Sequence, residues 1–238
     1  MIVDIDAGNS RIKWRVIKNG APDYKPPVTD ITTLLAALET EGPPTRIRLS
    51  SVGGRTIAEE LEKQAAQWGC QLQQAGTTRE AAGLHCGYLE PSSMGVDRWL
   101  ALLAVRDQFK GACVVVDAGT AITVDLLNEQ GCHLGGYIVP GFPMIYQSLN
   151  RGTSNIRLEP VSIADCSPGK TTGEAVSHGA YLMIKTLIEA SRSTLQTNTQ
   201  PVKVIVTGGD GSVLIGALSG DCIYVRDLVL DGLEVMFP

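Results

Sequence analysis

The chain has 238 residues, of which 44% are hydrophobic and 19% are charged, and its formal net charge at pH 7 is −5. This composition is typical of a globular protein and lacks the basic excess that marks a nucleic-acid-binding surface. No apolar run approaches the roughly 20 residues that a membrane-spanning helix needs, and the first residues show a strand pattern rather than a signal peptide. We therefore expect a cytoplasmic protein that binds neither nucleic acid nor membrane.

The cysteines and histidines give no metal-site spacing. The sequence contains no C-x-x-C pair, and its six cysteines are Cys70, Cys86, Cys113, Cys132, Cys166 and Cys222. The three histidines, His85, His133 and His178, are scattered along the chain. We expect reduced cysteines and no zinc site.

A short segment near the start of the chain is repeated in its second half. Asp4 to Ser10 is echoed by Val116 to Ala121: each follows an apolar, β-branched run and contains Asp-Ala-Gly followed by a short polar residue. Each then leads into a predicted strand, over 11–17 and 122–127. The repeat predicts two related halves, which we place at residues 1–110 and 111–238.

Each repeated segment predicts a β-hairpin whose turn can hold a phosphate. Gly8 and Gly119 allow positive φ and let a bulky anion approach the backbone N–H groups. Asp6 and Asp117, at strand ends, could hold a cation directly or through water. Asp-x-Gly is also typical of an ordinary hairpin turn, but the matched repeat favours two phosphate-binding turns.

The other elements alternate between helix and strand, which indicates a mixed α/β fold. In the strand that follows the first turn, Lys13 and Arg15 alternate with apolar residues, the pattern of a half-buried strand. Further strands are expected at 46–52, 69–72, 131–139, 202–206 and 223–225, with 21–31 as a loop or edge strand. Helices are expected at 32–40, 56–68, 100–109, 142–149, 173–195 and 228–235, the fifth capped by Thr171 or Thr172.

An irregular stretch, residues 84–94, leads into Gly95-Val96-Asp97-Arg98-Trp99 at the start of a predicted helix. Irregular segments of this length inside a compact protein are often functional. Asp97 could therefore serve a reaction, or it could only stabilise the first turn of the helix.

Six segments occur in this order: Asp6-x-Gly8-Asn9-Ser10, Gly95-x-Asp97-Arg98-Trp99, Asp117-x-Gly119-Thr120-Ala121, Gly135-Gly136-Tyr137-Ile138-x-Pro140-Gly141, Thr172-x-Glu174-Ala175 and Thr207-Gly208-Gly209-Asp210. Together they span essentially the whole chain and closely resemble the type III pantothenate kinase family. The first, third and last are shared with sugar kinases, actin and Hsp70-type ATPases. The second and fourth point to this family in particular.

The resemblance implies an α/β fold of two ribonuclease-H-like halves, of the actin and acetate kinase type, with ATP in the interdomain cleft. It implies transfer of the ATP γ-phosphoryl group to the 4′-hydroxyl of pantothenate, the first step towards coenzyme A. It also implies Mg²⁺, a monovalent cation (K⁺ or NH₄⁺) and a homodimer.

The same resemblance implies roles for individual residues. The residues matched to ATP binding are Asp6, Ala7, Gly8, Asn9, Ser10, Arg11, Ile12, Lys13 and Thr120. Those matched to pantothenate binding are Tyr88, Gly95, Val96, Asp97, Arg98 and Thr172. Asp97 matches the proton acceptor and Asp117 the ligand of the monovalent cation, while Asp6 is expected to organise Mg²⁺ through water. Arg98 could pair with the substrate carboxylate or hold Asp97.

One stretch departs from the family pattern, and two other functions compete with the kinase. Residues 149–158 lack the Leu-Pro pair that the family commonly carries, which leaves the shape of that loop open. Another kinase or ATPase of the superfamily would share the phosphate turns, but the segment from Tyr88 to Trp99 argues against it. A non-enzymatic transcription accessory factor is the other alternative; the intact Asp97 and Asp117 and the absence of a DNA-reading module argue against it.

Overall fold

The computed structural model describes residues 1–52, 55–152, 165–196, 201–216 and 218–238. These residues form two compact units, Met1–Gln108 together with Leu228–Pro238, and Phe109–Asp227. Most of the atypical stretch 149–158 lies outside the described residues. Across the described ranges, no helix is both long enough and apolar enough to cross a membrane.

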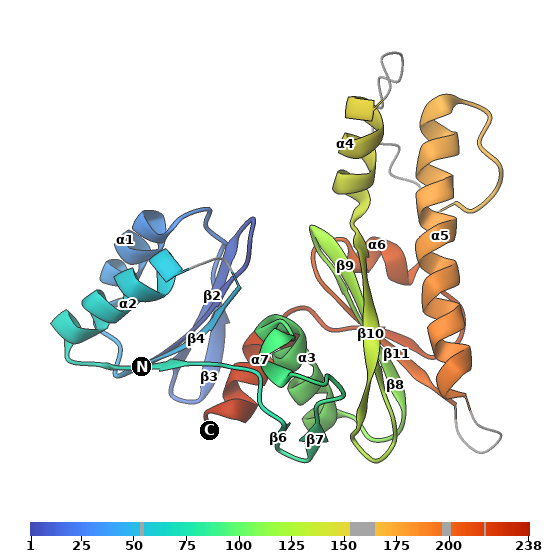
Figure 1. The fold of residues 1–238 in the computed structure, drawn as a ribbon. Coiled ribbons are helices and arrows are strands. Elements are labelled where there is room, and N and C mark those ends of the chain that lie inside the picture. The colour runs from blue at the N-terminus through green and yellow to red at the C-terminus, as the bar shows by residue number, and fades with distance from the viewer. Residues whose placement is uncertain (53–54, 153–164, 197–200, 217) are drawn as a thin grey trace. The chain divides into compact units, whose positions relative to one another are not determined.

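The first unit contains a five-stranded sheet in the order β3-β2-β1-β4-β5 (Figure 1). Its elements are β1 (Ile2–Ala7), β2 (Ile12–Lys18), β3 (Ala21–Tyr24), α1 (Ile31–Glu41), β4 (Arg46–Ser51), α2 (Arg55–Trp68), β5 (Gln71–Gln74), β6 (Glu80–Ala81), β7 (Leu84–His85), the 3-10 turn η1 (Pro91–Ser93), α3 (Val96–Gln108) and α7 (Leu228–Met236).

The second unit contains a five-stranded sheet in the order β10-β9-β8-β11-β12. Its elements are β8 (Cys113–Ala118), β9 (Ala121–Leu127), β10 (His133–Pro140), α4 (Phe142–Gly152), α5 (Thr172–Leu195), β11 (Lys203–Thr207), α6 (Gly211–Ile215) and β12 (Cys222–Tyr224).

The two sheets have the same topology. In each, the first two strands form an antiparallel hairpin, and the third strand pairs antiparallel with the second. The fourth strand then pairs parallel with the first, and the fifth with the fourth. This is the ribonuclease-H-like arrangement, so the predicted fold of both halves is confirmed.

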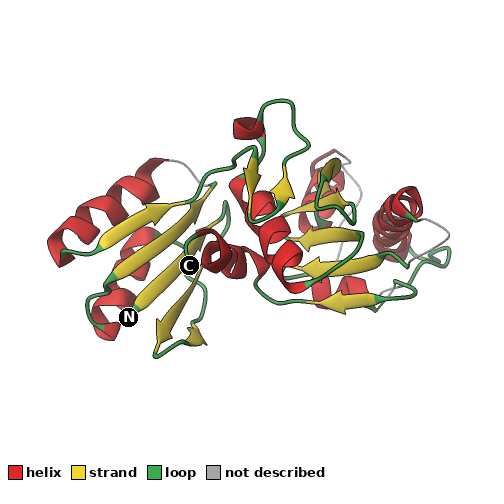
Figure 2. Cartoon of the chain, turned by 90° about the horizontal axis from the view of Figure 1, so that it is seen from below, coloured by secondary structure: helices red, strands yellow, loops and turns green. Residues whose placement is uncertain are grey.

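Apolar faces hold each unit together. In the first sheet, Val3, Ile5 and Ala7 pack with residues of α1 and α2, and Figure 2 shows these helices beside the strands. In the second sheet, alternate residues of the central strands pack against α5, which contributes Ile184 and Ile188. The start of α5 is capped by Thr171, whose Oγ1 accepts the N–H of Glu174 while the Glu174 carboxylate accepts the N–H of Thr171.

The last helix, α7, lies in the first unit, whereas we placed residues 228–238 in the second half. It packs against α3, and Gly232 faces the backbone of Leu100 so closely that a Cβ would clash there. Leu228, Leu230 and Leu233 are buried. The apolar residues of α7 are buried against α3, β1 and β4, which belong to the first half of the sequence. This packing places the last helix in the first unit.

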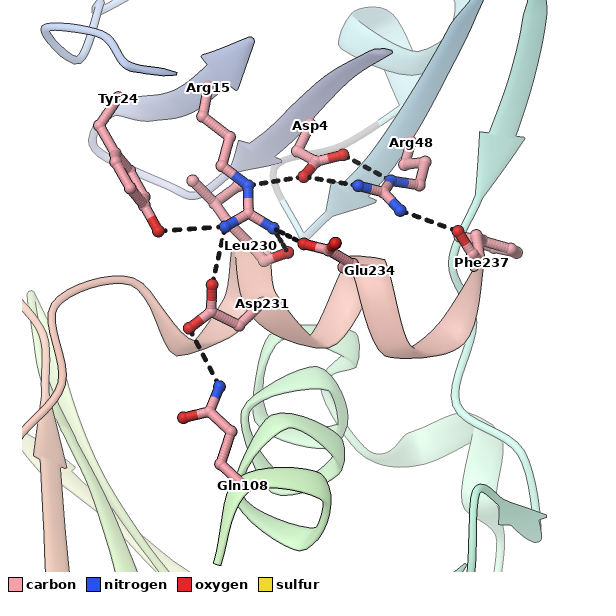
Figure 3. Close-up of polar contacts among 9 residues, drawn as sticks. All are labelled: Asp4, Arg15, Tyr24, Arg48, Gln108, Leu230, Asp231, Glu234 and Phe237. Atoms are coloured by element: carbon pink, nitrogen blue, oxygen red, sulfur yellow. Dashed lines mark hydrogen bonds and ion pairs between the residues drawn. The ribbon is translucent and has the colours of Figure 1, made fainter. Parts of the chain in front are cut away.

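The face of the first sheet opposite α1 and α2 carries a buried network of charges (Figure 3). Asp4 lies between Arg15 on β2 and Arg48 on β4, and none of the three is more than 1% exposed. Its carboxylate accepts from Arg15 Nε at 2.7 Å and from Arg48 Nε at 2.6 Å. Sequence alternation predicted a half-buried strand at β2, but it did not predict that Arg15 is buried as deeply as its apolar neighbours.

The two arginines extend this network to α7. Arg15 donates to Asp231 Oδ1 at 2.7 Å, to the Leu230 carbonyl at 2.9 Å and to Glu234 Oε2 at 3.0 Å (Figure 3). Arg48 donates to the Phe237 carbonyl at 2.8 Å. Burial by itself lowers the pKa of Arg15, but the hydrogen bond and charge of Asp4 raise it above its ordinary value. Arg15 therefore remains charged.

Candidate functional site

The first predicted phosphate turn joins β1 to β2. The Gly8 N–H donates to the Arg11 carbonyl at 3.1 Å, and Asn9, Ser10 and Arg11 are exposed. Gly8 does not use the positive φ that glycine allows. A Cβ at Gly8 would lie 3.3 Å from the Arg11 oxygen, so the glycine is favoured by the tight closure of the turn.

Asp6, Lys13 and Ser50 lie in one row across three neighbouring strands. Asp6 pairs in register with Lys13 on β2 and with Ser50 on β4, so the three side chains share a face of the sheet. Ser50 Oγ donates to Asp6 Oδ1 at 3.0 Å. Sequence reasoning identified Asp6 and Lys13 but missed Ser50, because only the parallel pairing of β1 with β4 brings it beside Asp6.

The second predicted turn, between β8 and β9, is closed by the Gly119 N–H, which donates to the Ala121 carbonyl at 3.1 Å. Gly119 does not use a positive φ either. Asp117 is half-buried at the end of β8, and Thr120 is exposed at the turn. Both repeated segments thus form hairpin turns that follow an aspartate, although neither depends on left-handed glycine geometry.

Two glycines that follow later strands pack against this second turn. The Gly141 N–H donates to the Thr120 carbonyl at 3.0 Å, and a Cβ at Gly141 would clash with that carbonyl. Gly208 has a φ of +90°, and a Cβ there would clash with Asp117 Oδ1 and with the backbone of Ala118. Positive φ thus occurs at Gly208 rather than at Gly119, and the absence of a side chain at Gly208 lets the chain pass close to the Asp117 carboxylate.

Asp97 lies in the first turn of α3, where a carboxylate interacts favourably with the helix dipole. Its Oδ1 accepts the N–H of Arg98 at 2.8 Å, and the residue is half-buried. A Cβ on Gly95 would lie 2.5 Å from that Oδ1, so a glycine leaves the space that the carboxylate occupies. Both uses considered for Asp97 fit this position, because a carboxylate that stabilises the helix start is still partly accessible.

Arg98 is buried and bonded to Tyr88. Its Nη1 donates to the Tyr88 hydroxyl at 2.7 Å, and its guanidinium lies 5.4 Å from the centre of the tyrosine ring. The structure therefore brings together Tyr88, Asp97 and Arg98, which the family resemblance matched to pantothenate binding. Val96 is buried at the first position of α3, beside Gly95.

Thr172, the remaining residue matched to pantothenate binding, lies in the second unit. It is the first residue of α5 and is exposed, while its neighbour Thr171 provides the cap. The sequence left both threonines as candidate caps, and the structure assigns that role to Thr171. The side chain of Thr172 is therefore not used as the N-cap of α5.

The carboxylates fit a metal that is held partly by a nucleotide rather than by the protein alone. Among the described residues, no group of three or more His, Cys, Asp or Glu side chains could hold a metal ion. Mg²⁺ in kinases is usually bound by one or two carboxylates together with substrate phosphates and water. Asp6, hydrogen-bonded to Ser50 in the first unit, has the chemistry of such a ligand. Asp117 is a separate carboxylate in the second unit.

Comparison with known proteins shows the family. The family model described as type III pantothenate kinase matches residues 2–193. The type III pantothenate kinase of Chromohalobacter salexigens is 34% identical over 252 residues, which cover 100% of this chain and 88% of that protein. The chain belongs to the type III pantothenate kinase family.

Solved structures agree with the fold seen in this family member. A Campylobacter jejuni protein named as a Baf family transcriptional activator has a TM-score of 0.66 and 23% identity, with 98% of this chain and 95% of that chain covered. The activator of the 2-hydroxyisocaproyl-CoA dehydratase from Clostridium difficile, solved with bound ADPNP, has a TM-score of 0.54 and 11% identity, with 99% and 92% covered. At these identities the two structures support the fold alone.

Proposed function

We propose that this protein transfers the γ-phosphoryl group of ATP to the 4′-hydroxyl of pantothenate, which commits pantothenate to coenzyme A synthesis. The observation that carries the proposal is the full-length family relationship combined with the grouping of Tyr88, Asp97 and Arg98 in the first unit. The proposal places the enzyme in the cytoplasm, where thiols stay reduced; its six cysteines are all free.

For ATP, we propose the loop from Asp6 to Lys13 as the phosphate-binding segment and Thr120 as a further contact. Exposed backbone N–H groups in the turn and the ammonium group of Lys13 suit the charge on the phosphate oxygens. Asp6 and Ser50 would hold Mg²⁺, and Asp117 would hold the monovalent cation. Bound cations supply positive charge that balances the negative charge of the transferring phosphoryl group.

For pantothenate, we propose binding by Tyr88, by Gly95 to Arg98 and by Thr172. In the reaction, the 4′-hydroxyl oxygen forms a bond to the γ-phosphorus as the bond to the ADP oxygen breaks. Asp97 accepts the hydroxyl proton and orients that oxygen for in-line attack. Arg98 is already bonded to Tyr88, so its contribution is to hold the tyrosine ring and to add positive charge near the substrate carboxylate.

The experiment that tests the proposed function is a coupled assay of ADP release with Mg-ATP, run with and without pantothenate. Turnover that depends on pantothenate would support the proposal. ATP hydrolysis that is indifferent to pantothenate would instead indicate another ATPase of the superfamily. Bound ATP without any turnover would favour the accessory-factor alternative.

Replacing Asp117 with alanine is expected to abolish the activation by potassium. The carboxylate is half-buried beside the backbone of Gly208, so its removal takes away the charged ligand that we assign to the monovalent cation. The measurement is the ratio of turnover in K⁺ to turnover in Na⁺, for the parent and for Asp117→Ala. Asp221→Ala, which removes an exposed carboxylate from the same unit, should keep the parental ratio. An equal ratio in the parent and in Asp117→Ala would place the cation elsewhere.

We propose that the active form is a homodimer joined through the second unit. Exposed apolar side chains occur on β10, α4 and α5, and α4 contacts the other two elements. They are Leu134 (56% exposed), Tyr137 (49%), Ile138 (62%), Met144 (43%), Leu182 (48%) and Met183 (50%). The strand β10 also lies at the edge of its sheet, where a second copy could cover both its backbone and these side chains.

A charge in this apolar surface should separate the dimer. Ile138→Lys is expected to sediment as a monomer at concentrations where the parent sediments as a dimer, because a lysine would be desolvated at the interface. Val213→Lys changes an exposed apolar residue on α6 and should leave the dimer intact. A dimeric Ile138→Lys variant, or a monomeric parent, would contradict the proposal.

A further inference from the structure

An arginine outside the motifs holds the loop that carries Tyr88. Arg79 Nη1 donates to the Tyr88 carbonyl at 2.7 Å and to the Cys86 carbonyl at 3.4 Å. Its Nη2 donates to the Leu89 carbonyl at 2.6 Å. One guanidinium thus joins three carbonyls of a four-residue segment, while the Cys86 N–H donates back to the Arg79 carbonyl at 2.9 Å.

These bonds define the position of Tyr88 from its backbone, while Arg98 defines it from its ring. Residues 86–90 form no helix or strand. Cys86 is buried, but Leu89 is 92% exposed and Gly87 and Glu90 are exposed, so the part of the loop around Tyr88 has little apolar packing of its own. Without the guanidinium, the carbonyls of Tyr88 and Leu89 would be satisfied by water, and the loop would sample more conformations. The Tyr88 hydroxyl would then spend less time at the Arg98 Nη1.

We propose that Arg79 is a positioning residue for the acceptor substrate, and that it acts through Tyr88. This inference rests on the proposed function, in which Tyr88 contacts pantothenate. The planar fork of the guanidinium is required, because an ammonium group cannot reach the same carbonyls from two separate nitrogens. Arg79 is exposed, and within the part of the chain that the structure describes it makes no ion pair. Its guanidinium bonds go to carbonyls of residues 86–89, so we place its role in this loop.

The test compares Arg79→Ala and Arg79→Lys with the parent by steady-state kinetics in both substrates. We expect the KM for pantothenate to rise about tenfold in each variant, the loss expected when bonds that preorganise a binding loop are removed. The KM for ATP and the thermal midpoint should stay at the parental values. Arg106→Gln is the matched control, because it removes another arginine whose Nε donates to a backbone carbonyl of the same region, that of Gly83. An unchanged KM for pantothenate, or an equal rise in the KM for ATP, would overturn the inference.

Two further measurements separate the inference from the proposed function. In a Tyr88→Ala background, Arg79→Ala should raise the KM for pantothenate by less than a further twofold, because the effect of Arg79 passes through the tyrosine. A full additional tenfold rise would overturn the proposal.

Amide hydrogen exchange over residues 86–90 should be faster in Arg79→Ala than in the parent, with or without substrate. Unchanged exchange there would overturn the inference even in an active kinase. If the parent shows no pantothenate-dependent turnover but exchange is still faster in Arg79→Ala, the proposed function is rejected, whereas the conclusion that Arg79 orders the loop is supported.

Discussion

Asp97→Asn is expected to lower pantothenate-dependent turnover by about 10²- to 10⁴-fold while leaving ATP affinity near that of the parent. The amide oxygen of asparagine can still accept the Arg98 N–H that Asp97 Oδ1 accepts at 2.8 Å, so the start of α3 should keep its geometry. The amide cannot take the proton of the substrate hydroxyl, and it carries no charge to orient that hydroxyl. The loss should therefore appear in kcat rather than in ATP binding, which calorimetry measures separately.

The matched control for this variant is Asp107→Asn, which removes a carboxylate from the other end of the same helix. Asp107 is exposed, and we expect its variant to turn over at the parental rate. Turnover of Asp97→Asn within tenfold of the parent would exclude Asp97 as the proton acceptor and leave it the role of stabilising the start of α3.

Asp4→Asn is expected to lower the free energy of unfolding of the first unit by about 3 to 5 kcal/mol, the cost of removing one partner from a buried ion pair. The carboxylate bonds both Arg15 and Arg48, and the three residues are almost completely buried. The neutral amide would leave two guanidinium groups without their shared counter-charge. Arg15 would keep its bonds to α7 and Arg48 its bond to the Phe237 carbonyl, but one of the two oxygens that accept from these arginines would become an NH₂ group facing guanidinium donors.

Tryptophan fluorescence during urea denaturation is a suitable measurement. The three tryptophans, Trp14, Trp68 and Trp99, all lie in the first unit, so the transition reports the unit that contains the network. Glu60→Gln makes the same acid-to-amide change in the exposed pair with Lys63 and should shift stability by less than about 1 kcal/mol. A similarly small shift for Asp4→Asn would show that the buried network contributes little to holding α7.

Local pattern was sufficient to predict most of the secondary structure and the repeated topology. Alternation and capping are local properties, so the strands around Asp6 and Asp117, the helix that begins near Asp97 and the cap of α5 could be recognised without tertiary information. The repeated Asp-Ala-Gly segments likewise predicted two similar halves, and both sheets have the same strand order. Features that depend only on neighbours along the chain could therefore be predicted from the sequence alone.

Contacts between distant residues decided the rest. Arg15 pairs with Asp231, which is 216 residues away, so nothing near Arg15 distinguishes it from a solvated strand arginine. Gly208 has positive φ where the chain passes close to Asp117, whereas the turn pattern pointed to the conformational freedom of Gly119 instead. Ser50 reaches Asp6, and Arg79 reaches the Tyr88 loop, only once the strands and loops have assembled. The sequence determined which elements form and which side chains can do chemistry; the tertiary structure decided which of those side chains meet, because long-range pairing leaves no local periodicity.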